Sequence, residues 1–182
     1  LTVADSDDFS FGSGAFTIEA WVKPTTISNK TWIAKWVSGQ YEWFFGTNGD
    51  ELKFAYSTNG SGYTILDSGY NMQVDQWQHI AVTKDGTEIK MYLDGELIHT
   101  ESIAATTITY NEGTNLRLGT RTASCASYFS SSFNGRIDEV RIWDDVRTAA
   151  EIADNKDDEL VGNENGLVAY YKMGDGSGTA LT

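Results

Sequence analysis

The stretch Trp77–Thr100, WQHIAVTKDGTEIKMYLDGELIHT, decides the fold that this sequence predicts. Asp85-Gly86 and Asp94-Gly95 interrupt it, and Asp-Gly pairs favour hairpin turns because glycine accepts a positive φ. Between the turns lie three short runs that are typical of β-strands, namely Trp77–Lys84, Glu88–Leu93 and Leu97–Thr100. The stretch therefore predicts a three-stranded antiparallel meander and disfavours a helix.

Similar patterns extend over the rest of the chain. In Phe16–Pro24, apolar residues alternate with Thr, Glu, Trp and Lys, which predicts a half-buried strand. Thr148 followed by Glu151 is a capping-box pattern, and it predicts one short helix from Ala149 to about Asn155. Further strands are expected at Trp32–Val37, Tyr41–Gly46, Glu51–Ser57, Tyr63–Leu66, Leu116–Leu118, Phe133–Trp143 and Leu167–Met173. The sequence thus predicts an all-β chain with one helix.

Three blocks of sequence resemble the laminin-G-like jelly-roll modules, which are relatives of the concanavalin A-like lectins, glucanases and pentraxins. The blocks are FTIEAWVKP (Phe16–Pro24), W-x-H-I-A-V-T-x-D-G with the following Y-x-D-G (Trp77–Gly95), and FNGRIDEVRIWDDVRTAAEI (Phe133–Ile152). They occur in the order that the family shows. The resemblance implies a two-sheet antiparallel jelly-roll sandwich, a fold that hosts many binding specificities.

The length of 182 residues suits one such domain over residues 1–182. The final segment, Gly166–Thr182, resembles a pattern that family members carry near their start. It either closes this sandwich or opens a following copy, and closure is favoured because an unpaired sheet edge is prone to aggregation. Both alternatives suggest a module of a longer protein, with neighbouring domains in the same chain.

The formal net charge of -13 argues against binding to nucleic acid or to anionic membranes. It is compatible with binding Ca²⁺, which prefers oxygen ligands, and equally with a role in solubility. No apolar run is long enough to predict insertion into a membrane. Cys125 is the only cysteine, so an internal disulfide is excluded.

Two aspartates are candidate calcium ligands. Asp138 is in phase with Val140 and Ile142 and should face the apolar side of its strand, if no bulge intervenes. The resemblance implies that an aspartate of this late strand binds a structural calcium together with backbone oxygens near the amino terminus. The alternative is an ion pair with an arginine. Asp175, in a Gly-Asp-Gly-Ser-Gly turn, is the second candidate, and its alternative is an ordinary turn residue.

Catalysis is not expected. Glycosidases with a related jelly roll carry E-x-D-x-x-E on one strand, and the comparable residues here are Arg136, Asp138 and Arg141. Both glutamates are thus replaced by arginines. A mechanism that needs a pair of carboxylates lacks its parts.

Binding through aromatic side chains is the better-supported hypothesis. Aromatic rings can stack on the apolar face of a sugar while amides and carboxylates bind its hydroxyls. The candidate ligand-binding residues are Trp36, Tyr41, Trp43, Asn48, Asp50, Tyr56, Asn59, Tyr63 and Tyr128. The alternative for each ring is a place in the core. We therefore expect an exposed aromatic patch near residues 36–63 or in the loop 120–132.

Together these patterns predict a non-catalytic binding module that recognises a glycan at a cell surface or extracellular polymer, with structural or bridging calcium. Its parent would be a secreted, surface-displayed or virion protein. The alternative is a structural or protein-interaction module of an adhesin, capsid or fibre without glycan affinity.

Overall fold

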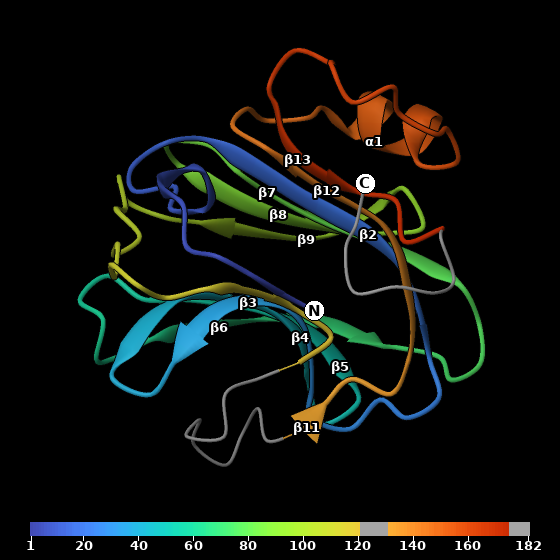
Figure 1. Cartoon of the computed structure of the whole chain (residues 1–182), viewed down its shortest axis with the longest axis horizontal. Helices are drawn as coiled ribbons and strands as arrows, with labels where there is room; N and C mark the ends of the chain where they lie inside the picture. Colours follow the sequence, from blue (N-terminus) through green and yellow to red (C-terminus); the bar gives the residue numbers. More distant parts are fainter. Residues whose placement is uncertain (121–130, 175–182) are drawn as a thin grey trace.

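The computed structural model describes residues 1–120 and 131–174, and it shows two stacked β-sheets (Figure 1). Sheet A has the strand order β1 (Thr2–Val3), β10 (Leu116–Leu118), β3 (Lys30–Val37), β4 (Gln40–Asn48), β5 (Glu51–Tyr56) and β6 (Thr64–Asn71). Sheet B has the order β13 (Leu167–Tyr171), β12 (Gly135–Trp143), β2 (Phe16–Pro24), β7 (Gln78–Lys84), β8 (Glu88–Leu93) and β9 (Glu96–Ser102). These neighbours pair antiparallel, whereas the short β11 (Ser131–Ser132) pairs parallel with β3. The predicted jelly-roll sandwich is confirmed.

The core lies between the two sheets and is built by alternation along the strands. In β2, Phe16, Ile18, Ala20 and Val22 are all fully buried, as their spacing predicts. They pack with aromatic side chains of sheet A, among them Phe54. The intervening residues of β2 therefore lie on the outer face of sheet B, where they meet the site described below.

The predicted meander is β7–β8–β9, but its two turns are held differently. Asp94 and Gly95 have φ values of 53° and 86°, so both lie in the left-handed region that an Asp-Gly hairpin favours. Gly86 is not left-handed. There the Asp85 carboxylate accepts the backbone N–H groups of Thr87 at 2.7 Å and Glu88 at 2.8 Å. The prediction of a turn was correct, and the expected role of Gly86 was wrong.

The first and the last strand of the chain, β1 and β13, lie at the edges of the two sheets. Leu167–Tyr171 pairs antiparallel with β12 and forms an edge strand of sheet B. The N-terminal Thr2–Val3 pairs with β10 at the edge of sheet A. The strand expected at Tyr63–Leu66 instead runs over Thr64–Asn71, because β5 pairs with it as far as Asn71.

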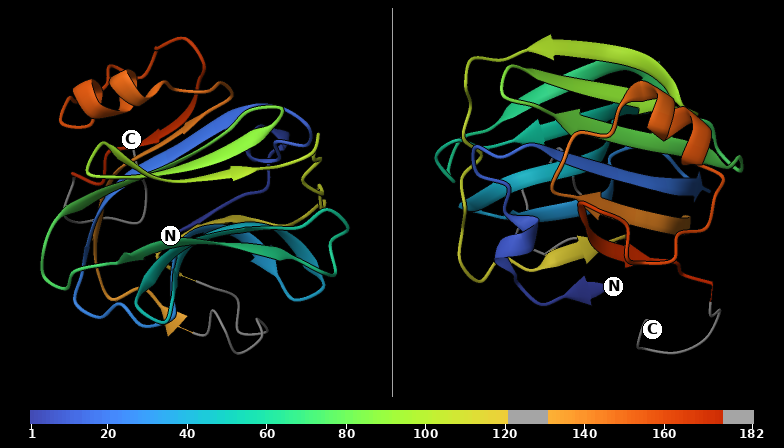
Figure 2. Two further views of the ribbon diagram at one scale, coloured as in Figure 1. Left: turned by 180° about the vertical axis from the view of Figure 1, so that it is seen from behind. Right: turned by 90° about the horizontal axis from the view of Figure 1, so that it is seen from above.

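The helix α1 (Ala149–Asn155) lies over the outer face of sheet B (Figure 2). The predicted capping box is present, since the Thr148 hydroxyl accepts the Glu151 N–H and the Glu151 carboxylate accepts the Thr148 N–H. Ile152 packs on Ala81 of β7 and Tyr92 of β8. One short 3-10 helix, η1 (Asp7–Phe9), precedes β2. Within residues 1–120 and 131–174, no helix has the length and apolar character needed to span a membrane.

Candidate functional site

Two of the predicted ligand-binding rings belong to the core. Trp43 and Tyr56 are buried among the side chains between the sheets, and the Trp43 Nε1 donates to the Phe9 carbonyl at 2.9 Å. The expectation that they face polar loops was wrong. Both lie in phase with the inward-facing residues of their strands, and burial of large rings is the main source of stability in such a core.

Trp36, Tyr41 and Tyr63 do gather, at one end of sheet A. The Trp36 and Tyr41 rings stack with centroids 4.5 Å apart, and Tyr63 lies 5.2 and 5.5 Å from them. However, Trp36 and Tyr41 are buried, at 4% and 8% exposure, while Tyr63 is 37% exposed. The predicted patch is thus reduced here to the edge of one tyrosine.

Of the polar residues that were expected to accompany these rings, only Asn59 lies near them, since the carbonyl of its neighbour Gly60 accepts the Tyr41 N–H at 3.0 Å. Asn48 and Asp50 lie at the opposite end of β4 from Tyr41, roughly 23 Å away for seven extended residues. The Asn59 side chain accepts the N–H groups of Ser61 and Gly62, so it closes its own turn. Tyr128 lies outside the described residues, as does Asp175. The described candidates do not form one site.

Asp138 lies on the outer face of sheet B, not on the core side. Asp138 is opposite Trp21 and Arg141 is opposite Glu19, with a shift of register between them. Two residues of β12, Glu139 and Val140, therefore face one residue of β2, which is a β-bulge. The expectation of an inward-facing Asp138 was wrong for this reason. The spacing of the apolar residues was the available signal. Core positions of a regular strand are two residues apart, as are Val140 and Ile142, whereas Ile137 and Val140 are three residues apart.

The bulge has a consequence for the outer face. Glu139 has a φ of 50°, an uncommon backbone conformation for a residue other than glycine. Asp138 and Glu139 are successive residues, yet both line the same hollow. In a regular strand, successive side chains point to opposite faces. The bulge therefore presents two carboxylates side by side.

This hollow has a volume of about 300 Å³, and it is lined by Trp21, Trp77, Asp138 and Glu139. Trp21 comes from β2, Asp138 and Glu139 come from β12, and Trp77 directly precedes β7; these three strands are adjacent in sheet B. Trp77 is 40% exposed. Neither tryptophan was predicted as a site residue. Trp21 occupies an outward position of β2, and a tryptophan in that phase was a signal in the sequence.

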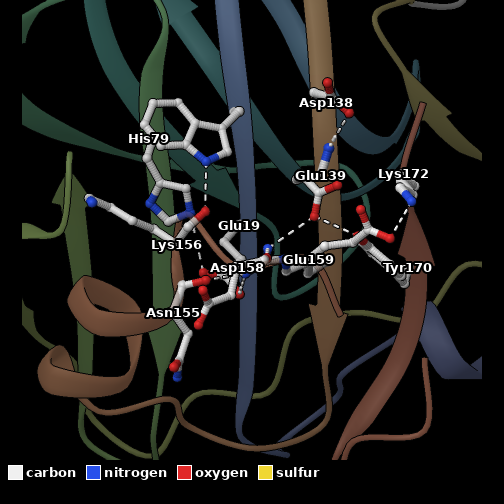
Figure 3. Close-up of polar contacts among 12 residues, drawn as sticks. Glu19, His79, Asp138, Glu139, Asn155, Lys156, Asp158, Glu159, Tyr170 and Lys172 are labelled. Atoms are coloured by element: carbon white, nitrogen blue, oxygen red, sulfur yellow. Dashed lines mark hydrogen bonds and ion pairs between the residues drawn. The ribbon is translucent and has the colours of Figure 1, made fainter. Parts of the chain in front are cut away.

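Hydrogen bonds and ion pairs join Glu139 to side chains of the neighbouring positions of sheet B (Figure 3). The Trp21 Nε1 donates to the Lys156 carbonyl at 2.7 Å, and the His79 ring packs edge-on with its centroid 5.4 Å away. The Glu139 carboxylate accepts the Tyr170 hydroxyl at 2.6 Å and the Arg141 Nη2 at 3.0 Å. These contacts fix the orientation of Trp21 and Glu139 in the absence of a ligand.

Next to these residues, on the same face of sheet B, lies a buried ionic network. Arg141 is 1% exposed, and its guanidinium donates to the carbonyls of Asn155 and Asp158, which ties the end of α1 to the sheet. Glu19 is 3.7 Å from the Arg141 Nη1 and 3.3 Å from the His79 Nε2. Burial alone would raise the pKa of Glu19, but His79, Arg141 and a hydrogen bond from Trp143 together lower the pKa.

Asp138 differs from these paired groups. Its carboxylate accepts the Glu139 N–H at 2.9 Å, and none of the ion pairs among the described residues includes it. The alternative of an ion pair with Arg141 is not realised, because Arg141 pairs with Glu19 and Glu139. Partial burial raises the pKa of Asp138, and the charge of Glu139 adds to this effect.

The described residues do not fit a closed calcium site at Asp138. Within residues 1–120 and 131–174, no three acidic, histidine or cysteine side chains are grouped so that they could hold a metal ion. The neighbouring carboxylate of Glu139 already serves Arg141 and Tyr170. A calcium cage normally needs six or more oxygens, several of them from carboxylates.

The chain is similar to known proteins over most of its length. The family described as the concanavalin A-like lectin/glucanases superfamily matches residues 2–153. A candidate carbohydrate-binding protein from Bacteroides ovatus has a similar structure, with a TM-score of 0.76 and 20% identity over 100% of this chain and 51% of that chain. The present chain thus spans about half the length of that relative.

Two further solved structures share the fold. One is domain 4 of AbnA, an extracellular GH43 arabinanase from Geobacillus stearothermophilus, in complex with arabinotriose; its TM-score is 0.61, with 18% identity over 84% of this chain and 71% of that chain. The other is a heptameric SAP-like pentraxin from Limulus polyphemus, with a TM-score of 0.60 and 14% identity over 86% of this chain and 77% of that chain. No curated protein sequence matches the chain significantly.

Proposed function

Because the chain belongs to the concanavalin A-like lectin/glucanases superfamily, we propose that it is a non-catalytic carbohydrate-binding module. The observation that carries the proposal is the hollow lined by Trp21, Trp77, Asp138 and Glu139. An exposed indole offers a flat apolar surface for the C–H face of a sugar, and carboxylates accept its hydroxyls. A hollow of about 300 Å³ is at the small end for a ligand site, which suits one or two sugar units.

The arrangement of the two carboxylates supports binding and not hydrolysis. A glycosidase places two carboxyl groups on either side of the scissile bond, with one of them protonated. Here both groups come from successive residues of one strand, so they approach a ligand from one side. Glu139 accepts hydrogen bonds from Arg141 and Tyr170, so its carboxylate is already engaged by side chains of the protein.

The wider setting of the module is part of the proposal. Domain 4 of the arabinanase, bound to arabinotriose, belongs to an extracellular enzyme. By analogy, this chain would serve outside the cell as one module of a longer protein that carries it to a polysaccharide. The alternative, a protein-interaction module without glycan affinity, uses the same fold.

Calcium is the least supported part of the proposal. The side chains at Asp138 give no closed cage, and Asp175 lies outside the described residues. A thermal melt with and without a chelator decides the matter. A melting temperature that is unchanged by chelator would count against a structural ion.

The binding proposal is tested with a glycan array, followed by calorimetric titration of the best ligand. We expect Trp77→Ala to lower the affinity at least about tenfold, since loss of a stacking ring removes on the order of 1–2 kcal/mol. Tyr70→Ala is the matched control, because Tyr70 is similarly exposed but lies on β6 of the other sheet.

Each outcome has a distinct meaning. Equal binding by wild type and Trp77→Ala would remove the hollow as the site, and loss of binding in Tyr63→Ala would then move it to sheet A. A uniformly negative array would favour the protein-interaction alternative.

A further inference from the structure

Outside the hollow, three aromatic rings that lie near a carboxylate also lie near a lysine or an arginine. Arg147 lies 4.5 Å from the Trp143 ring and pairs with Glu151 at 2.8 Å. Arg141 lies 6.0 Å from the Tyr170 ring and pairs with Glu139 at 3.0 Å. A cation held between a π-face and a carboxylate is stabilised by both.

The same combination occurs at the N-terminal side of the sandwich. Lys35 is fully buried, with its Nζ 5.6 Å from the Tyr110 ring and 2.6 Å from the Asp5 carboxylate. All three cases therefore unite a ring, a carboxylate and a lysine or arginine of the chain itself.

The hollow on sheet B has two indole rings and one carboxylate, that of Asp138, that belongs to none of the ion pairs among the described residues, whereas Glu139 is paired with Arg141. Among the residues that the structure describes, its lining consists of Trp21, Trp77, Asp138 and Glu139. Arg141 lies further along the same outer face, opposite Glu19, where it is buried and donates to Glu139 and to two carbonyls.

The remaining cations of this face lie outside the lining. Lys172 pairs with the Glu159 carboxylate, and Lys156 pairs with Asp157. Lys23 and Arg136 are opposite each other, one pair further along the outer face of β2 and β12. None of these four contributes to the lining of the hollow.

Asp138 is the group that such a cation would complete. Its carboxylate is half-buried and belongs to none of the ion pairs among the described residues, and the charge of Lys172 lowers its pKa without outweighing the effect of burial. Burial raises its pKa, in contrast to the paired Glu19, whose pKa is lowered. A positively charged ligand in the hollow would lower the pKa of Asp138, as the neighbouring cations lower that of Glu19.

We propose that the ligand of this hollow is a glycan with a free ammonium group, such as an oligosaccharide of glucosamine, bound with its cation between the indoles and the carboxylates of Asp138 and Glu139. This inference rests on the proposed carbohydrate-binding function and narrows its ligand class. Acidic sugars would be rejected, because two carboxylates line the hollow.

The test compares glucosamine tetramers with N-acetylglucosamine tetramers, which have the same backbone without the charge. Calorimetric titration is done at a pH at which the amines are protonated. We expect the charged tetramer to bind at least about tenfold more tightly to the wild type, and the preference to shrink with added salt.

Two variants separate a local effect from the overall charge of the protein. Asp138→Asn should reduce the preference for the charged tetramer to below about threefold. Asp50→Asn removes the same charge at an exposed turn of sheet A and should leave the preference unchanged.

Each alternative outcome overturns the inference. Equal or tighter binding of the acetylated tetramer would refute the ammonium ligand and leave carbohydrate binding intact. A preference that persists in Asp138→Asn would assign it to the net charge. Absence of binding by any glycan would refute the proposed function as well.

Discussion

Two groups of aromatic rings lie outside the main core of this sandwich, and they differ in what surrounds them. Trp36 and Tyr41 of sheet A stack on each other and pack with Phe44 and with small apolar residues. Trp21 and Trp77 of sheet B border two carboxylates and a hollow. The first group resembles a small second core, whereas the second offers both the apolar and the polar contacts that a sugar needs.

The comparison shows that aromatic residues near a loop do not by themselves indicate a binding site. Trp36 and Tyr63 lie in the region, residues 36–63, where an exposed aromatic patch was expected, yet most of the ring surface there is buried. The partner groups decide the role. The following experiments test whether the two groups of rings really differ in this way.

The largest expected effect concerns the packed group. Trp36→Ala should lower the free energy of unfolding by about 3–5 kcal/mol, because it removes a large buried ring. Affinity for the glycan should change less than threefold. Trp77→Ala should show the reverse pattern, with about 1–2 kcal/mol lost from stability because its ring is only partly buried. Urea denaturation and calorimetric titration of both variants measure this. A stability loss in Trp77→Ala as large as that in Trp36→Ala would erase the distinction.

The next effect concerns the buried ionic network of Glu19, Glu139 and Arg141 beside the hollow. Arg141→Met should cost about 3 kcal/mol, since Glu19 and Glu139 lose their shared guanidinium and two carbonyls near α1 lose a donor. Arg147→Met is the control, because its ion pairs lie nearer the surface and contribute about 1 kcal/mol or less. Denaturant titrations compare the two. Similar losses in both variants would show that the buried network is not the foundation of this face.

The smallest effect is a pH dependence at Asp138. Its pKa in the folded protein is raised above the ordinary value of about 3.9, so folding favours its protonated form. The ionised carboxylate therefore costs stability, and this cost grows as the pH rises through the raised pKa. Asp138→Asn should increase the melting temperature at pH 7, and the difference should vanish below about pH 4.

Asp50→Asn should show no such trend. A decrease of the melting temperature in Asp138→Asn at pH 7 would mean that the carboxylate makes a stabilising contact.

The features that local sequence determines were predicted well. The alternation in β2 identified its buried face, and Thr148 with Glu151 identified the start of α1, because each pattern acts over a few neighbouring residues. The turn at Asp94-Gly95 belongs to the same class.

The site was harder to predict, because its residues come from three strands and one of these is irregular. The phase of Asp138 was extrapolated from Val140 and Ile142, and the bulge at Glu139 reversed it. The burial of Trp36 and Trp43 likewise depends on the strands that pack against them. No local pattern contains that information. Trp21 is part of a candidate site because the pairing of β12 with β2 places two carboxylates beside it, and this pairing is not contained in the local sequence.

The shared origin of the hollow in β2, β7 and β12 bears on how the protein is made. During synthesis, Trp21 and Trp77 leave the ribosome long before Asp138, so no growing chain that lacks β12 contains a complete hollow. Truncated or misassembled products would pass through a column of immobilised ligand. Retention on such a column would select intact, correctly folded molecules during purification.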